Sequence, residues 1–263
     1  MKEYDVLIAD PAGNITAMVL NDVERKDYMF IANKLMEMKE YGIEQVGFVK
    51  NPEMGGELRL EMMGGEFCGN ATRSFGFYLA KKKEETGYKK VIVEISGCSN
   101  NLEVNTDVKN NYARTEMPLP KEINYISIDN RCFPVIVFEG IVHVIAENVQ
   151  ENNELYEEVK QAIINKYICD AFGIMFFNTE KLQIVPVVYV RETNTVVYEN
   201  SCGSGSLATA VYLSKDNSDG IYSYDISNPK GIIEVQVYKQ DGKITKATIG
   251  GKVFLSNIYT FKF

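Results

Sequence analysis

The chain carries the same short motif twice, as Gly64-Gly65-Glu66-Phe67-Cys68-Gly69-Asn70-Ala71 and as Ser201-Cys202-Gly203-Ser204-Gly205-Ser206. A Tyr-Leu pair follows both cysteines at the same offset. Strand-like residues precede each motif, and apolar residues at three- and four-residue steps follow it, which places each cysteine at a strand-to-helix turn. The repetition predicts two similar halves, each containing one such turn and helix.

Hydrophobic periodicity predicts two further helices, at about 22–41 and 153–166. The first of these opens with an Asn21-x-x-Glu24 capping pattern and is expected to stop at Gly42. Apolar runs predict strands, with Asp241-Gly242 as a hairpin turn. The strands are expected at 4–9, 16–20, 58–63, 91–95, 102–104, 126–128, 135–138, 142–146, 184–190, 195–198, 233–238 and 243–249. This mixture predicts an α+β fold.

The best boundary between the halves is Met117-Pro118-Leu119-Pro120. Two prolines one residue apart interrupt both helix and sheet. We therefore expect an N-terminal lobe at 1–118 that contains Cys68 and is completed by a C-terminal strand at about 252–263. The second lobe is expected at 119–251, contains Cys202, and forms the site together with the first.

The overall composition is that of an ordinary globular protein, with 263 residues of which 45% are hydrophobic and 24% charged. The net charge of −8 disfavours binding to nucleic acid or to an anionic membrane. The first residues do not resemble a secretory signal, and the apolar stretches are too short to span a bilayer. We expect a cytoplasmic protein.

The five cysteines are expected to be free thiols, because their number is odd and no export signal precedes them. No C-x-x-C pair is present, and the single histidine, His143, has no metal-ligand neighbour at a useful spacing. We therefore expect no metal. The sequence also lacks a glycine-rich phosphate loop and gives no sign of a pyridoxal lysine, so no cofactor is expected.

A thiol at a helix N-terminus loses its proton more easily than a free one, because the unpaired N–H groups and the helix dipole stabilise the thiolate. Two such thiols, Cys68 and Cys202, can flank one small substrate and invert a stereocentre by removing a proton from one side and returning one from the other. The backbone N–H groups of Gly69, Asn70, Gly203 and Ser204 can bind the substrate carboxylate. The alternative is that both cysteines simply pack in the core.

These segments resemble the two active-site segments of the diaminopimelate epimerase family of cofactor-independent amino-acid racemases. Gly13-Asn14 resembles that family's N-terminal Gly-Asn, and Gly140-Ile141-Val142-His143 stands where the family has Gly-Asn-Pro-His. The resemblance implies two pseudo-symmetric lobes, each a curved, mostly antiparallel sheet around a central helix. It also implies a two-base mechanism in which Cys68 and Cys202 are the catalytic residues.

The chain departs from diaminopimelate epimerases in the residues that hold the distal end of the substrate. The Asn ahead of the first cysteine is absent, and the family's Asn-Pro is Ile141-Val142. A pocket without those partners should reject diaminopimelate, because the second charged end would be buried unpaired. The motifs look more like the histidine racemase branch, so histidine is the expected substrate. Diaminopimelate or another amino acid remains an alternative, as does a non-catalytic binding or redox-sensing module.

Four further residues are candidates for the site. Glu199 is the acid nearest the second cysteine, and the resemblance implies that it receives the substrate α-ammonium; its alternative is a solvated acid. The resemblance also assigns Asn14 to the pocket. For His143 we favour a hydrogen-bonded position in the core over a contact with the substrate. Glu66 either fixes the loop or changes the acidity of the Cys68 thiol, or it is simply exposed to solvent. The expected partner is a small amino acid, and association into a homodimer is left open.

Overall fold

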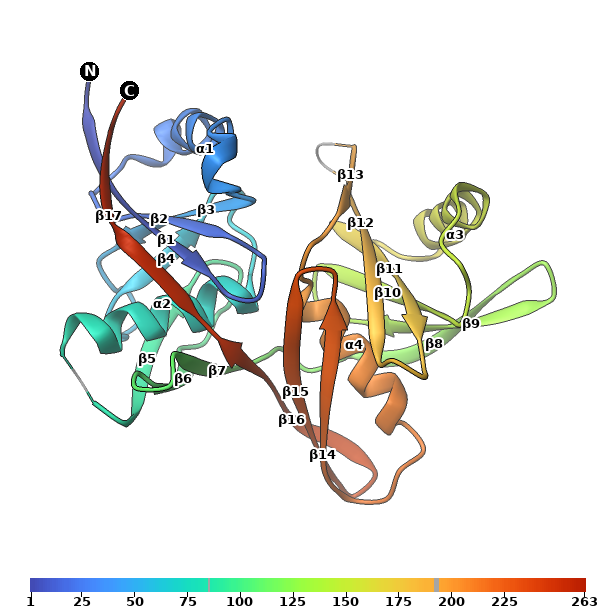
Figure 1. Ribbon diagram of the computed structural model, residues 1–263. Coiled ribbons are helices and arrows are strands. Elements are labelled where there is room, and N and C mark those ends of the chain that lie inside the picture. The colour runs from blue at the N-terminus through green and yellow to red at the C-terminus, as the bar shows by residue number, and fades with distance from the viewer. Residues whose placement is uncertain (85, 192–193) are drawn as a thin grey trace. The chain divides into compact units, whose positions relative to one another are not determined.

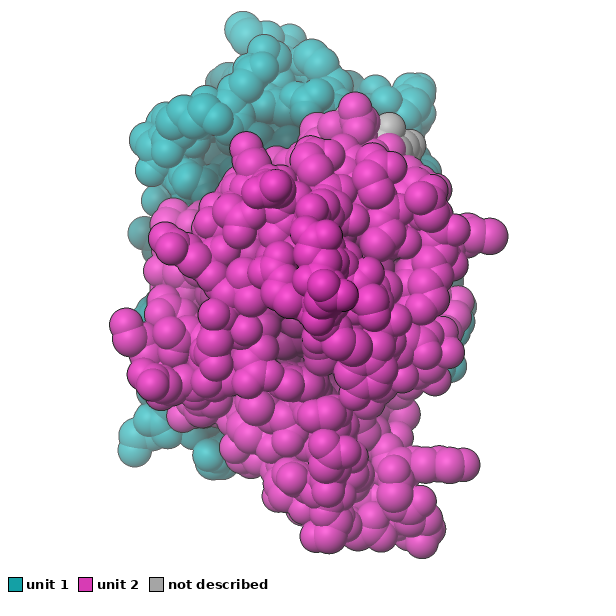
Figure 2. Space-filling model, turned by 90° about the vertical axis from the view of Figure 1, so that its right-hand side faces the viewer, with its two compact units in different colours: residues 1–116, 250–263 teal, residues 117–249 magenta. Residues whose placement is uncertain are grey.

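The computed structural model describes residues 1–84, 86–191 and 194–263, and the chain divides into two compact units. Unit 1 comprises residues 1–116 and 250–263, and unit 2 comprises residues 117–249 (Figure 2). Sheets dominate each unit and a few helices pack on them (Figure 1). The predicted α+β class is confirmed. Across the described ranges, no helix has the length and apolar character that crossing a membrane requires.

In unit 1 the two ends of the chain share one sheet, because β1 pairs antiparallel with β17 from Glu3↔Lys262 to Asp10↔Phe254. From β1 the sheet continues through β2, β3, β4, β5, β6 and β7, and the β2–β3 and β4–β5 pairs are parallel. The strands are β1 (Glu3–Asp10), β2 (Thr16–Val19), β3 (Gln45–Lys50), β4 (Arg59–Met62), β5 (Tyr88–Ile95), β6 (Leu102–Asp107), β7 (Tyr112–Glu116) and β17 (Phe254–Lys262).

In unit 2 the sheet runs through β8, β9, β10, β11 and β12, and β12 pairs with both β13 and β14. The β10–β11 and β12–β14 pairs are parallel, and β14 pairs antiparallel with β15. The strands are β8 (Glu122–Ile128), β9 (Arg131–Val137), β10 (Ile141–Glu147), β11 (Ala171–Asn178), β12 (Gln183–Val190), β13 (Thr195–Tyr198), β14 (Gly220–Asn228) and β15 (Gly231–Gln240), with β16 (Lys243–Lys252) after the Asp241-Gly242 turn.

The helices occupy equivalent places in the two units. In unit 1, α1 lies in the chain between the parallel strands β2 and β3, and α2 between β4 and β5; in unit 2, α3 lies between β10 and β11, and α4 between β12 and β14. The helices are α1 (Tyr28–Met36), α2 (Gly69–Lys82), α3 (Asn153–Lys166) and α4 (Gly203–Ser214). The two units therefore share the duplicated motif and also the same order of strands and connecting helices.

The sheet of unit 1 is buried on both faces. Val6 and Ile8 of β1 join the cluster under α1, while the alternate residues Leu7 and Ala9 join the cluster around α2. Every residue of α2 from Gly69 to Ala80 is buried, as expected for a helix surrounded by sheet. A polar or charged side chain placed at the start of such a helix is therefore held in a fixed environment.

The predicted helix at 22–41 is wrong in length, since α1 covers only Tyr28–Met36, between the 3-10 turns η1 (Arg25–Asp27) and η2 (Lys39–Tyr41). The Asn21 side chain does not cap it, because its Oδ1 accepts the backbone N–H of Asp5 at 2.5 Å. The expected stop at Gly42 is wrong for this helix, which ends at Met36 with Glu37 as its C-cap, whereas Gly42, left-handed at φ 61°, ends the 3-10 turn η2. The helix at 153–166 is confirmed, with Asn152 as its N-cap.

All the predicted strands are present, some of them longer than expected. Four more strands were not predicted, namely β3, β7, β11 and β14. Three of these, β3, β11 and β14, are members of parallel pairs, and two of them carry residues that bond to the cysteines, Gln45 on β3 and Asn228 on β14.

Candidate active site

Cys68 is the N-cap residue of α2, in extended backbone conformation between the turn after β4 and the first helical turn. Its Sγ accepts the backbone N–H of Ala71 at 3.4 Å. The Thr72 hydroxyl donates to the Cys68 carbonyl oxygen at 2.7 Å, which fixes the backbone from which the thiol projects. Cys68 is half-buried.

A cluster of neutral amide and hydroxyl groups surrounds the Cys68 sulfur. Gln45 donates from Nε2 to Cys68 Sγ at 3.3 Å, and the same nitrogen lies 2.8 Å from both Asn14 Oδ1 and Thr16 Oγ1. Asn14 in turn donates from Nδ2 to Glu44 Oε2 at 3.2 Å. The parallel register of β2 and β3, which sets Thr16 opposite Gln45, brings these groups together. Hydrogen bonds donated to sulfur favour its thiolate form.

Asn70 and Arg73 hold the first turn of α2 in place. Both are buried, and Arg73 Nε donates to Asn70 Oδ1 at 3.1 Å. The two terminal nitrogens of Arg73 donate to the backbone carbonyls of Pro11, Gly251 and Lys252 at 3.0 to 3.1 Å. Arg73 therefore links α2 to the loop that leads to Asn14 and to the end of β16.

Glu66 is exposed on the turn before Cys68. Its backbone carbonyl accepts the Ser96 hydroxyl at 2.9 Å, and that same hydroxyl accepts the backbone N–H of Met62 at 2.8 Å. These bonds hold the turn through the backbone of Glu66. The effect of its carboxyl on the Cys68 thiol stays a prediction.

Cys202 occupies the equivalent position at the start of α4, where its Sγ accepts the backbone N–H of Gly205 at 3.2 Å. It is 3% exposed, and its own N–H donates to Asn228 Oδ1 at 2.9 Å. Burial raises the pKa of the Cys202 thiol well above its usual range, and the charge and hydrogen bond of the Glu199 carboxylate raise it further. Cys202 therefore favours the protonated thiol.

His143 is a buried residue of β10 that reaches this thiol through Ser204. His143 Nε2 lies 2.9 Å from Ser204 Oγ, and Ser204 Oγ lies 3.6 Å from Cys202 Sγ. Burial lowers the pKa of His143 to about 3, so the ring is neutral at physiological pH. The interpretation of His143 as a hydrogen-bonded core residue agrees with this placement.

The two cysteine sites share a backbone arrangement and differ in chemistry. Each sulfur is the N-cap of a largely buried helix and accepts one of its first backbone N–H groups. The Cys68 sulfur receives an amide N–H from Gln45, whereas the Cys202 sulfur lies beside the Glu199 carboxylate and is more deeply buried. The Cys68 sulfur also lies 3.8 Å from Asn14 Oδ1, so it lies among neutral amide groups, whereas Cys202 lies beside a carboxylate that favours its protonated form.

Sequence reasoning missed Gln45, Arg73 and Asn228. Gln45 reaches Cys68 through the pairing of β2 with β3, and Asn228 accepts the N–H of Cys202 from the end of β14; neither β3 nor β14 was predicted. Arg73 lies two residues after the first motif, and its charge at the start of an otherwise mainly uncharged helix is the signal that would have identified it.

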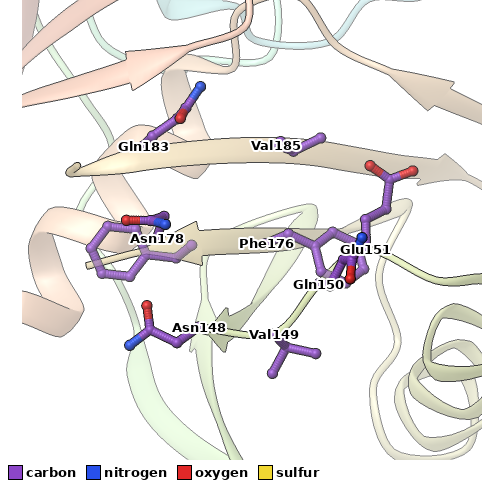
Figure 3. A pocket seen from close by; sticks show the side chains of 9 residues that line it. Asn148, Val149, Gln150, Glu151, Phe176, Asn178, Gln183 and Val185 are labelled. Carbon is purple, nitrogen blue, oxygen red and sulfur yellow. The ribbon is translucent and has the colours of Figure 1, made fainter. Parts of the chain in front are cut away.

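A hollow of about 640 Å³ opens elsewhere on unit 2, at the carboxyl ends of β10 and β11 (Figure 3). Its lining mixes side-chain amides with apolar side chains: Asn148, Val149, Gln150, Glu151, Phe176, Phe177, Asn178, Gln183 and Val185. None of the candidate site residues lines it. In the part of the chain that the structure describes, no group of three or more His, Cys, Asp or Glu side chains is arranged to hold a metal ion.

Comparison with known proteins gives consistent results. A family model described as the histidine racemase CntK N-terminal domain matches residues 5–258. A histidine racemase from Fusobacterium nucleatum subsp. nucleatum is 39% identical over 221 residues, which cover 80% of this chain and 81% of that protein. A histidine racemase from Staphylococcus aureus is 29% identical over 240 residues, covering 86% of this chain and 85% of that protein.

A solved structure with a similar fold is the hydroxyproline epimerase from Agrobacterium vitis with bound trans-4-OH-L-proline. The TM-score is 0.67 at 11% identity, and the match covers 98% of this chain and 92% of that one. At this identity the likeness concerns the fold.

Proposed function

This chain belongs to the histidine racemase family, and we propose that it interconverts L- and D-histidine by a two-base mechanism that needs no cofactor. The observation that carries the proposal is the duplicated placement of Cys68 and Cys202, each as the N-cap of a buried helix in units with the same strand connectivity. Packing alone does not require a thiol at both positions.

In the proposed reaction, one thiolate takes the α-proton of histidine and becomes a thiol. The electron pair left on the α-carbon then takes a proton from the other cysteine, which becomes the thiolate. The chirality is inverted when the second proton arrives on the opposite face, so the reaction requires the two sulfurs to reach opposite faces of one α-carbon. Each turnover leaves the two cysteines with exchanged protonation states.

The α-proton of an amino acid is weakly acidic, so the negative charge that develops must be stabilised. We assign this role to the backbone N–H groups of Gly69, Asn70, Gly203 and Ser204, at the positive ends of α2 and α4. These groups bind the substrate carboxylate, which shares the developing charge.

The surroundings of the sulfurs support complementary resting states. The raised pKa of Cys202 keeps it as the thiol, ready to donate a proton. The N–H that Gln45 donates to Cys68 favours the thiolate form there, ready to accept one. Asn14, hydrogen-bonded to Gln45, shapes the pocket beside Cys68, and Glu199 receives the α-ammonium group beside Cys202.

We further propose that the two units are the pseudo-symmetric lobes of a diaminopimelate-epimerase-like fold, with residues 1–118 and 252–263 in one and 119–251 in the other. The two compact units and their repeated connectivity support this division.

The test is proton exchange in D₂O under reducing conditions. Starting from L-histidine, we expect D-histidine that carries deuterium at Cα from the first turnovers, while the remaining L-histidine is still unlabelled, because the second thiol exchanges its proton with solvent before donating it. Chiral chromatography with mass spectrometry measures both. Protein with alkylated thiols is the control.

Other results of this assay contradict the proposal. Racemisation of diaminopimelate or another amino acid, and not of histidine, refutes the substrate. Product that retains the substrate proton argues for a single base. No exchange with any amino acid identifies a non-catalytic module.

Replacing Glu199 by Gln is expected to lower the pKa of the Cys202 thiol, because the carboxylate that opposes thiolate formation loses its charge. The pH dependence of Cys202 alkylation by iodoacetamide, followed by peptide mass spectrometry, should shift to lower pH. Glu139→Gln, at an exposed acid of the same unit, is the matched control. An unshifted or upward-shifted profile would show that Glu199 does not act on this thiol.

A further inference from the structure

Three side chains of unit 2 form a continuous polar chain that ends at the Cys202 sulfur. His143 Nε2 lies 2.9 Å from Ser204 Oγ, which lies 3.6 Å from Cys202 Sγ. His143 comes from β10, whereas Ser204 and Cys202 stand at the start of α4. The chain therefore connects the sheet to the thiol through one hydroxyl group.

The other edge of the His143 ring lies in apolar surroundings. Nδ1 has no hydrogen-bond partner among the residues that the structure describes, and the side chain is 0% exposed. A Cβ added to Gly173 would stand 2.6 Å from Nδ1 and 2.8 Å from the Met175 methyl group. Phe138 meets the ring edge-on, with centroids 6.1 Å apart. Gly173 is thus required for the ring to occupy this site.

These surroundings determine which of the two neutral tautomers of the ring, Nδ1–H or Nε2–H, is the more stable. If Nδ1 carried the proton, an N–H donor would be buried against carbon atoms without an acceptor, which folded proteins rarely tolerate. If Nε2 carries it, the buried Nδ1 is only an unfilled acceptor, and Nε2–H donates to Ser204 Oγ. The hydrogen bond made by one nitrogen fixes the proton position on the ring.

We propose that His143 is a positioning residue: its Nε2–H occupies a lone pair of the Ser204 oxygen, so that the Ser204 hydroxyl directs its only proton toward the Cys202 sulfur. Ser204 then stabilises the Cys202 thiolate that forms when this cysteine has given its proton to the substrate. This inference deepens the two-base mechanism and rests on it. His143 itself gains and loses no proton during the reaction, in keeping with its depressed pKa.

Nuclear magnetic resonance tests the proton position directly, because His143 is the only histidine in the chain. In the whole protein labelled with ¹⁵N-histidine, the two ring nitrogens should give one protonated Nε2 and one unprotonated Nδ1, with no change between about pH 5 and pH 9. A protonated Nδ1, or a ring that titrates in this range, would overturn the proposal.

Kinetic variants test the action through Ser204. His143→Leu should lower kcat roughly tenfold with little change in KM, the loss expected for one hydrogen bond to a charged group. His143→Gln, whose amide N–H can take the place of Nε2–H, should recover most of the rate. In a Ser204→Ala protein, which keeps the backbone N–H, adding His143→Leu should cause no further loss.

A purely structural histidine gives a different result. The loss from His143→Leu would then be as large in the Ser204→Ala protein as in the wild type, and His143→Gln would not restore kcat. The resonance measurement needs no turnover, so it decides the tautomer even if histidine proves not to be the substrate. Failure of the proposed function appears instead in the deuterium assay on the unaltered protein.

Discussion

Replacing either Cys68 or Cys202 by alanine is expected to abolish histidine racemisation, lowering the rate by roughly 10³-fold or more, because each removes one of the two groups that move protons. The size of this effect follows from the role assigned to the sulfur. One remaining thiol can remove a proton from one face, but it cannot deliver one to the other. Chiral chromatography of the product measures the loss for each variant.

Both cysteines also cap a helix, so the loss of activity must be separated from loss of structure. Each sulfur accepts a backbone N–H of its helix, and loss of a cap costs about 1 kcal/mol. Cys68→Ser and Cys202→Ser keep a good N-cap acceptor but replace the thiol by a far weaker acid. They should be as inactive as the alanine variants and more stable.

Cys132→Ala is the matched control, because Cys132 is exposed and belongs to neither motif. It should retain full activity. Full activity in a Cys68 or Cys202 variant whose circular dichroism matches the wild type would refute the two-base mechanism.

The second large effect is expected on stability. Arg73→Met should lower the free energy of unfolding by about 3–5 kcal/mol, because it leaves the buried carbonyls of Pro11 and Gly251 and the partly buried carbonyl of Lys252 without their charged donor. Urea denaturation followed by circular dichroism measures the change.

Two variants sharpen this test. Arg73→Lys keeps the charge but cannot reach all three carbonyls with one ammonium group, so an intermediate loss is expected. Arg131→Met removes an exposed arginine of unit 2 and should change stability by less than about 1 kcal/mol. A loss at Arg73 no larger than that at Arg131 would show that the buried guanidinium does not hold the unit together.

The elements that were predicted are those with local signals. A capping residue, a break in the pattern or a hydrophobic period lies within a few residues of each of them. Examples are the cysteine turns, the helix at 153–166 and the strand at 195–198. The start of α1 was misplaced because Asn21, which is a good cap by type, binds the backbone of Asp5 instead. Competition for one side chain by a distant strand has no signature in the local sequence.

The missed strands β3 and β11 are both held in parallel pairs. Their partners β2 and β10 lie beyond a helix in the chain, and β11 is buried along nearly its whole length, so it shows no alternation. The prediction of the candidate site was incomplete for the same reason. The motifs identified the two cysteines, but the contact of Gln45 with Cys68 depends on the register of β2 and β3.

The pairing of β1 with β17 has a consequence for how the protein is made. Residues 3–10 pair on one side with β2, which follows directly in the chain, but on the other side with residues 254–262. Until residues 254–262 have been synthesised, one edge of β1 has no partner strand, while the whole of the compact unit at residues 117–249 has already been made. Unit 2 should therefore be able to fold before unit 1 is complete, and a product truncated before residue 254 would be prone to aggregate through the open edge of β1.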